Sequence, residues 1–473
     1  MNVVLTFVSI LVCGLIVVAV PSMVTPYVAE YGPVTVFDTS KAILLCAALA
    51  SLAGLFAYRQ STGAFLLKLF ISALLIRMIL GTIIFVSNGQ NFFGGDAITY
   101  DFYGNAQLMG WYGDRYAQSV ADIYVRSWSA AGWGMVYMVA GVYGIIGRNL
   151  LAVQFVNAVF GAATAVVVYL CAHHVYSNLR VARLAGIAAA FYPSLVLWSS
   201  QGLKDGPIVF FLAISMLATL RLGEKLSFKY IVVLVCSLLA VLSFRFYVFY
   251  MICFAVGGAF VIGTQKLTTN SFFRQLSAIA ILGLALTYLG VTRSATVQFE
   301  RFGNLEAVQR SRDDAARSAE SGFGREVDVS TTTGALTAIP IGLVYLLFAP
   351  FPWQLVSLRQ SLTLPEMIIW WASFPMLVLG LWFSFRYRLR LISPILIFTL
   401  MLSLAYSVFQ GNVGTAYRQR AQLLVFYFIF VAVGYVLMLE KREERKRAIL
   451  AARQSVVAPG VASTLGRSRE LHQ

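Results

Sequence analysis

The chain has 473 residues, of which 59% are hydrophobic and only 12% are charged. An ordinary soluble domain is roughly 25% charged, so this composition excludes a soluble protein with a normal charged surface. The net charge of +16 does not indicate nucleic-acid binding, because the basic residues gather at the ends of apolar runs. That pattern is typical of membrane proteins oriented by the positive-inside rule.

The apolar runs predict an all-α, polytopic membrane protein with about twelve transmembrane helices. The first run has no basic residues before it and no convincing cleavage site after it, so we interpret it as a span and not as a signal peptide. The predicted spans, in chain order, are 3–20, 41–57, 64–87, 149–174, 183–199, 207–221, 229–243, 246–263, 275–292, 367–384, 391–409 and 421–439.

Two further apolar stretches, 131–147 and 335–350, are interpreted as non-spanning. With that choice every basic segment between spans falls on the cytoplasmic side, together with both chain ends. If 335–350 crossed, one basic segment would lie on the wrong side. The basic segments are 178–183, 221–229, 385–390 and 441–447. The same orientation places 88–148, 293–334 and the turn 411–420 on the outer face.

This pattern divides the chain into five parts. They are an N-terminal pair of transmembrane helices (1–58), a transmembrane core (59–292) that includes the outer loop 88–148, an outer polar loop (293–336), a C-terminal transmembrane region (337–440) and a cytoplasmic basic tail (441–473) that we expect to be disordered. The five cysteines all lie within apolar runs, so the sequence shows no disulfide framework and no metal-ligand spacing.

Charged residues beside apolar segments are costly in a membrane, so function is the first hypothesis for them. Asp96 follows Gly94 and Gly95 at the start of the largest outer loop. It either caps an amphipathic helix running from Ala97 to about Met109 or acts as a general base at the membrane surface. The two interpretations are compatible, because a cap position holds a carboxylate rigidly.

Cations and polar groups occur in three other outer turns. Lys204 beside Asp205 either forms an interfacial ion pair or places a cation against a phosphate. Arg245, at the tip of a tight hairpin, either marks the water interface or belongs to a site. Arg418 and Arg420 open a span on the outer face, against the positive-inside trend, and this favours an anionic partner.

One chemistry fits a carboxylate and several cations at the depth of lipid phosphates. A sugar on a polyprenyl phosphate has a good leaving group that needs cations to hold its charge, and the acceptor hydroxyl needs a base. We therefore assign catalysis to Asp96 and Asp101, donor phosphate binding to Lys204, Arg418, Arg420 and Arg245, and substrate binding to Tyr100, Gln201 and Asp205.

The stretch from Phe65 to Leu222 resembles the core of GT-C glycosyltransferases, which include protein O-mannosyltransferases and lipid A aminoarabinose transferases. The order of features matches: a span, an outer loop with an Asp that enters a juxtamembrane helix, a second short helix and then the run from Gly147 to Ala158. The segments 181–186, 191–194, 200–201 and 204–205 also look like that family. The resemblance implies that the first-loop acid Asp96 is the base, and Arg418 and Arg420 resemble the family's late arginine element.

The chain departs from the family pattern in its first loop. Many members have an Asp-Glu pair there, whereas Ala97 follows Asp96, so Asp101 is either the second acid or the true base. Residues 1–58 look like an addition before the core. There is no large soluble C-terminal domain of the oligosaccharyltransferase kind, and this argues against glycosylation of peptide sequons.

The resemblance predicts an inverting glycosyltransferase on the outer face of a bacterial plasma membrane, with a polyprenyl-phosphate-linked sugar as donor. Its partners would be that donor and membrane lipid, with no nucleic acid, no evident protein partner and no cofactor. A divalent metal is unsupported, since Asp96 and Asp101 supply too few ligands. One alternative is a polysaccharide polymerase or O-antigen ligase, whose late outer loop would be 293–334. The other is a lipid-linked saccharide transporter, which would show an internal repeat and mid-span charges such as Arg77.

Overall fold

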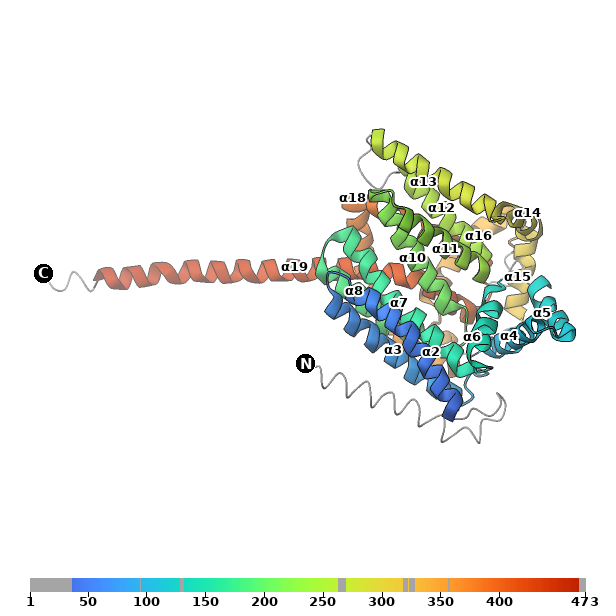
Figure 1. Cartoon of the computed structure of the whole chain (residues 1–473). Coiled ribbons are helices and arrows are strands. Elements are labelled where there is room, and N and C mark those ends of the chain that lie inside the picture. The colour runs from blue at the N-terminus through green and yellow to red at the C-terminus, as the bar shows by residue number, and fades with distance from the viewer. Residues whose placement is uncertain are drawn as a thin grey trace.

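The structure, a computed structural model, describes residues 36–93, 95–127, 132–262, 269–317, 322, 328–355 and 358–467. The predicted span 3–20 lies outside the described residues. The described part is a bundle of helices (Figure 1), apart from one isolated β-bridge between Gly322 and Asn412. The prediction of an all-α fold is confirmed.

The helices follow one another with short connections. In the first half they are α2 (Val36–Tyr58), α3 (Gly63–Val86), α4 (Asp96–Trp111), α5 (Arg115–Ser127), α6 (Gly134–Ile146), α7 (Leu150–Tyr176), α8 (Leu179–Phe191), α9 (Pro193–Ser199) and α10 (Asp205–Glu224). In the second half they are α11 (Phe228–Phe244), α12 (Phe246–Ile262), α13 (Thr269–Tyr288), α14 (Val291–Phe302), α15 (Leu305–Arg317), α16 (Thr332–Phe348), the short η3 (Pro352–Gln354) and α17 (Leu358–Ser361), α18 (Leu364–Phe409) and α19 (Val413–Arg467).

Helix α7 forms the centre of the N-terminal half. It is apolar all round, which predicts a helix surrounded by other helices, and it packs against α2, α3, α8 and α10. Arg77 of α3 is buried in the same region, where it donates hydrogen bonds to Ser199 Oγ (2.8 Å) and to the carbonyl oxygen of Ala190 (2.7 Å). Arg77 therefore faces the bundle, as its mid-span position indicated.

A proline divides the predicted span 183–199 into two helices. Pro193 has no N–H to donate and disfavours the helical conformation at the preceding residue, Tyr192, which is extended. Helices α8 and α9 are consequently bent by 53° relative to each other. The bend directs α9, which carries Ser194 and Trp198, across one end of the bundle.

Helix α18 consists of two helical halves joined without a break in its helical hydrogen bonds. The chain reverses direction at Arg388, whose backbone dihedral angles are not helical. Both halves contact one residue of α19: Trp370 stacks on Tyr427 at 6.2 Å, and Ser403 shares a 2.8 Å hydrogen bond with the same tyrosine. A straight helix would hold residues 370 and 403 about 50 Å apart. Helix α18 therefore contains both predicted spans, 367–384 and 391–409, joined by the basic turn.

The basic segments meet at one end of the bundle. Arg180 pairs with Glu443 at 3.2 Å, His174 lies 3.4 Å from Glu224, and the Tyr176 hydroxyl hydrogen-bonds Ser384 just before the turn of α18. These contacts join the ends of α7 and α10 and the start of α8 to the middle of α18, just before its turn, and to the middle of α19. The arrangement agrees with the single basic face that the sequence predicts.

Within the described residues, six helices are long and apolar enough to cross a membrane, or seven if α8 and α9 form one span. Helices α11, α12 and α16 have 17 residues each, about 25 Å against a hydrocarbon core of about 30 Å. The count of twelve therefore stays a prediction. Helix α16 packs on α18 through Gly342 and Ser407 and ends beside Trp370, so both of its ends lie away from the basic turns.

The tail differs from the expected disorder. Helix α19 runs on as a helix to Arg467 and extends away from the bundle (Figure 1). Its first exposed turns are rich in Glu, Lys, Arg and Ala, which have high helix propensity, and Glu443 precedes Arg447 by four positions. This local stability outweighs the polar composition on which the expectation of disorder was based.

Candidate active site

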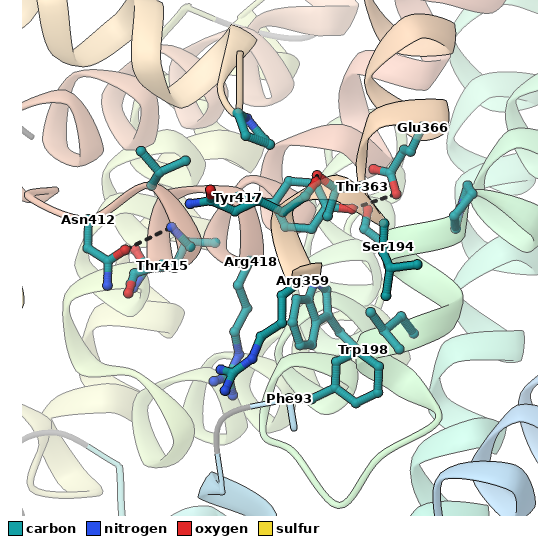
Figure 2. A pocket seen from close by; sticks show the side chains of 18 of the residues that line it. Phe93, Ser194, Trp198, Arg359, Thr363, Glu366, Asn412, Thr415, Tyr417 and Arg418 are labelled. Atoms are coloured by element: carbon teal, nitrogen blue, oxygen red, sulfur yellow. Dashed lines mark hydrogen bonds between the residues drawn. The ribbon is translucent and has the colours of Figure 1, made fainter. Parts of the chain in front are cut away.

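A cavity of about 1050 Å³ opens at the end of the bundle opposite the basic turns. Its walls come from α9, from the first turns of α18 and α19, from Pro350 and from residues between Arg359 and Thr363 (Figure 2). Asp96, Lys204, Arg245 and Arg418 reach its lining from four separate parts of the chain. The fold thus brings together charges that the sequence places in four different outer segments.

Arg418 is the centre of this charged cluster. Its Nε donates to Asp205 Oδ2 at 2.7 Å, its Nη2 lies in ion-pair contact with the same oxygen at 2.6 Å, and its Nη1 donates to Asp96 Oδ2 at 2.5 Å. Asp205 is 1% exposed, whereas the Asp96 side chain is 47% exposed. A partly buried guanidinium therefore joins one inaccessible carboxylate to one that the cavity can reach.

Arg245 adds a second guanidinium to Asp205. It is buried, with Nη2 3.7 Å from Asp205 Oδ1, and its guanidinium lies 5.8 Å from the Tyr247 ring. The hairpin tip thus faces the charged cluster, although a lone charge at such a tip more often marks the water interface. Because a carboxylate has two oxygens, Asp205 can pair with both arginines at once, although its single negative charge balances only one of the two positive charges.

Lys204 precedes the first residue of α10 and also faces the cavity. Burial, reinforced by the positive charge of Arg245, lowers the pKa of the Lys204 ammonium to about 7. Gly132 is one of the residues that shield the Lys204 ammonium from water. A Cβ atom at Gly132 would lie 2.3 Å from the Phe244 carbonyl oxygen and 3.7 Å from Lys204 Nζ. Asp205 forms ion pairs with the two arginines and not with Lys204, so of the two alternatives for Lys204 the structure does not contain the ion pair. That Lys204 binds a phosphate stays a prediction.

Asp96 opens α4 in a different way from the expected cap. The N-cap is Gly95, whose φ of 74° favours glycine, and Asp96 is the first helical residue. Its carboxylate binds Arg418, so no side-chain cap is formed. Tyr100 follows by one turn and is buried near the same charges, and burial raises its pKa well above the usual value.

Asp101 lies away from this cluster because five helical positions rotate a side chain by about 140° from Asp96. It accepts hydrogen bonds from the Tyr143 hydroxyl at 2.5 Å and from Arg148 Nε at 3.2 Å, and its second oxygen pairs with Arg148 Nη2 at 2.5 Å. This pairing fixes α4 to α6 and to the start of α7. Of these two acids of α4, Asp101 therefore has a structural position and Asp96 lines the cavity.

Arg420 and Gln201 are also separated from the cluster. Two helical positions place Arg420 about 200° from Arg418, and its Nη1 donates to the carbonyl oxygens of Leu347 and Ala349 at 3.1 Å each. The Gln201 side chain is buried and donates to the Leu197 carbonyl oxygen. Its own backbone carbonyl, with that of Leu203, accepts from Asn157, which holds the turn before Lys204.

Sequence reasoning missed several residues that line the cavity. Glu366, in the first turn of α18, accepts a 2.7 Å hydrogen bond from Tyr417, the residue before Arg418. Trp198 lies under the Arg418 guanidinium at 5.5 Å, and Arg359 reaches the lining from α17. The available signal for Glu366 was an acid at the start of an apolar span, which is costly without a role.

Within the described part of the chain, no group of three or more His, Cys, Asp or Glu side chains could hold a metal ion. The cluster at the cavity holds two carboxylates, and both are paired with Arg418. That the reaction needs no cofactor stays a prediction.

Fold and site together define a polytopic helical membrane protein with a charged cavity at one end. Residues 132–289, about a third of the chain, match the family profile of dolichyl-phosphate-mannose-protein mannosyltransferases. This match confirms the resemblance to GT-C membrane glycosyltransferases. It spans α6 to the end of α13 and includes Lys204, Asp205 and Arg245, while Asp96 and Arg418 lie outside it.

Among solved structures, the chain is similar to the archaeal oligosaccharyltransferase AglB from Archaeoglobus fulgidus in complex with an inhibitory peptide and a dolichol-phosphate. The identity is 13% and the TM-score 0.41, over 68% of this chain and 44% of that one. This chain thus spans less than half the length of that structure. A comparison with curated proteins finds no match.

Proposed function

We propose that the protein is an inverting GT-C-type glycosyltransferase that moves a sugar from a polyprenyl-phosphate-linked donor to a lipid, glycan or protein acceptor. The main support for this proposal is a cluster of charged residues at one end of a cavity of about 1050 Å³. Its members are Asp96, Lys204, Asp205, Arg245 and Arg418. It combines one accessible carboxylate with three cations, which is the set that this transfer needs.

Each charge has a role in the proposed reaction. Lys204, Arg245 and Arg418 hold the donor phosphate and stabilise the charge that develops on it as the bond from phosphate oxygen to sugar C1 breaks. Asp205 does not touch substrate, and its buried carboxylate fixes the two guanidinium groups. Asp96 accepts the proton of the acceptor hydroxyl while that oxygen forms the new bond to C1. Direct displacement inverts the configuration at C1.

The Arg418–Asp96 pair explains how the base is held before the substrates bind. A phosphate at the cluster competes with Asp96 for Arg418 Nη1, while Nε and Nη2 keep their contacts with Asp205. The freed Asp96 carboxylate, almost half exposed, then has room for an acceptor hydroxyl. Donor binding and activation of the base are coupled in this scheme.

The orientation of the bundle supports an active site on the outer face of a bacterial plasma membrane. The cluster lies at the start of α10 and the basic turns lie at its other end, 20 residues away. Those 20 residues span about 30 Å, the thickness of a hydrocarbon core. The positive-inside rule then assigns the basic turns to the cytoplasm.

The two other function classes are less well supported. A polymerase or O-antigen ligase would place its base on the late outer loop, but α14 and α15 contribute no residue to the cavity lining. A transporter would expose charges along the middle of its spans. The mid-span Arg77 instead binds Ser199 and the carbonyl oxygens of Ala73 and Ala190 within the bundle.

The central test is Asp96→Asn in purified protein with a polyprenyl-phosphate-linked sugar and membrane extract as acceptor source. Loss of the base removes a factor of about 10²–10⁴ in rate, so transfer should fall to background while the unfolding temperature stays near that of the wild type. The measurement is the radiolabelled sugar transferred per unit time.

Asp101→Asn is the matched control, since Asp101 is the other acid of α4. It should keep the transfer rate within a few-fold and lower the unfolding temperature, because it weakens the pair with Arg148. An active Asp96→Asn variant beside an inactive Asp101→Asn variant would reverse the assignment of the base. Full activity in both variants would refute the mechanism.

A further inference from the structure

A second polar site lies at the end of the cavity away from the charged cluster. Its centre is Glu366, which is 3% exposed and lines the cavity in the first turn of α18. With Thr363 it matches the capping-box pattern, yet Thr363 makes no side-chain cap bond. The carboxylate instead accepts the Tyr417 hydroxyl at 2.7 Å through Oε2, and Figure 2 shows Glu366 and Ser194 at the same side of the cavity.

Three buried polar atoms at this site make no hydrogen bond of good geometry within the described residues: Glu366 Oε1, Ser194 Oγ and Trp198 Nε1. Ser194 and Tyr192 nevertheless lie close enough to the Glu366 carboxylate for weak hydrogen bonds to it, so Trp198 Nε1 is the most clearly unsatisfied of the three. Their side chains are 3%, 1% and 9% exposed, and all three line the cavity. Leaving such groups unpaired is costly. The Glu366 carboxylate accepts hydrogen bonds, the Trp198 indole N–H donates one, and the Ser194 hydroxyl can do either. A ligand with several hydroxyl groups could form hydrogen bonds with all three.

Trp198 connects this site to the charged cluster. One side of its indole lies 5.5 Å from the Arg418 guanidinium, and its ring meets the Tyr417 ring at 6.4 Å. Tyr417 and Arg418 are consecutive in α19, so their side chains diverge by about 100°, one toward Glu366 and the other toward Asp96 and Asp205. A ligand that lies along Trp198 therefore reaches both ends of the cavity.

Sugars fit this combination of groups. The C–H face of a pyranose or furanose packs on an aromatic ring, and hydroxyl groups donate strong hydrogen bonds to a carboxylate. A phosphate held at Arg418 and Lys204 would direct an attached sugar along Trp198 toward Glu366. Trp198 thus lies between groups that can hold a phosphate and groups that can bind hydroxyls.

We propose that Glu366, Ser194 and Trp198 form the subsite that binds the hydroxyl groups of the donor's sugar, and that Tyr417 orients the Glu366 carboxylate. The proposal rests on the proposed function and deepens it, because it names residues that distinguish the sugar from the lipid phosphate. Glu366 determines affinity for the sugar, and the charged cluster determines affinity for the phosphate.

The experiment compares two kinds of lipid on the full-length protein in detergent. The probes are decaprenyl phosphate without a sugar and decaprenyl phosphate esters of mannose, glucose, galactose and arabinose, with binding followed by native mass spectrometry in the absence of acceptor. The wild type should bind at least one sugar ester more tightly than the bare phosphate. Glu366→Gln and Ser194→Ala should weaken that ester by roughly 10-fold or more and change the bare phosphate less than about 2-fold.

Two controls separate the possible outcomes. Glu443→Gln, an exposed glutamate at the opposite end, should change neither affinity, and Arg418→Ala should weaken both. Equal weakening of both lipids by Glu366→Gln, or no effect on either, would overturn the sugar subsite, as would a wild type that prefers no sugar ester. A wild type that binds neither lipid phosphate would instead refute the proposed function.

Discussion

At the scale of residues, the charged cluster depends on how one arginine divides its donors. Arg418 places two nitrogens on Asp205 and one on Asp96. A lysine, with a single point charge, could not hold a buried carboxylate in two-point contact and release an exposed one. Helical rotation explains why Arg420, two positions after Arg418, does not belong to the cluster. Its side chain points to another side of α19 and donates hydrogen bonds to backbone carbonyl oxygens.

Lys204 gives the cluster a dependence on pH. Burial and Arg245 lower its pKa to about 7, with Asp205, Arg418 and Asp96 as its other charged neighbours. The ammonium is therefore charged below pH 7 and loses its proton as the pH rises through 7. Affinity for a sugar phosphodiester of decaprenol, which does not titrate in this range, should fall by about 10-fold between pH 6 and pH 8.5.

Lys204→Arg tests this origin, because a guanidinium stays charged over the whole range. Binding titrations of the variant at five pH values should give a nearly constant affinity. A wild-type affinity that does not change with pH would contradict the lowered pKa. An unchanged pH profile in Lys204→Arg would assign the effect to another group.

At the scale of elements, the site depends on close packing of α18 against α19. A Cβ atom at Gly380 would lie 1.9 Å from the Phe430 carbonyl oxygen, and one at Gly434 would lie 2.0 Å from that of Met376. Two helices with facing glycines can approach until their backbones touch, a common way to pack helices in membranes. This contact holds α18 against α19, the two helices whose first turns carry Glu366 and Arg418.

Gly380→Ala should therefore destabilise the protein by about 1–3 kcal/mol, since the added methyl group meets backbone that cannot move aside. Thermal unfolding in detergent measures the change. Gly257→Ala on α12 is the matched control, because no atom lies within 4 Å of its Cβ position. It should be neutral or slightly stabilising. Equal unfolding temperatures for the two variants would show that the close contact does not matter.

At the scale of the whole molecule, the charged residues gather at the two ends of the helix bundle. The basic turns meet at one end through Arg180–Glu443 and His174–Glu224, and the cavity with its cluster lies at the other. Helix α16, with both ends away from the basic turns, does not disturb this sorting. A membrane around the bundle would separate the two ends.

The orientation can be tested with single cysteines in a cysteine-free protein and a membrane-impermeant maleimide on intact cells. Lys225→Cys and Arg390→Cys, in two basic turns, should be labelled only after the cells are opened. Asp114→Cys, between α4 and α5, should be labelled from outside. Labelling of Arg390→Cys on intact cells would mean that α16 crosses the membrane or that the bundle is inverted.

Composition and apolar runs determined the fold class, because a chain this poor in charge can satisfy its backbone only as helices in lipid. The sequence also identified five charged residues of the cluster, since charges beside apolar runs are conspicuous, but it missed Glu366. Asp96, Lys204, Asp205, Arg245 and Arg418 were all found in this way, and the structure brings them to one place.

Only the tertiary structure decided which charges share a site, because helical rotation and long-range packing set the direction of each side chain. Asp101 lies five helical positions after Asp96, and Arg420 lies two positions after Arg418, so both side chains point away from the cluster. Glu366 lines the cavity only because α18 begins beside α19. The sequence by itself determined that this is a helical membrane protein and predicted a set of charges on one face. The packing of α9, α10 and α18 around the first turns of α19 decided which of them form the site.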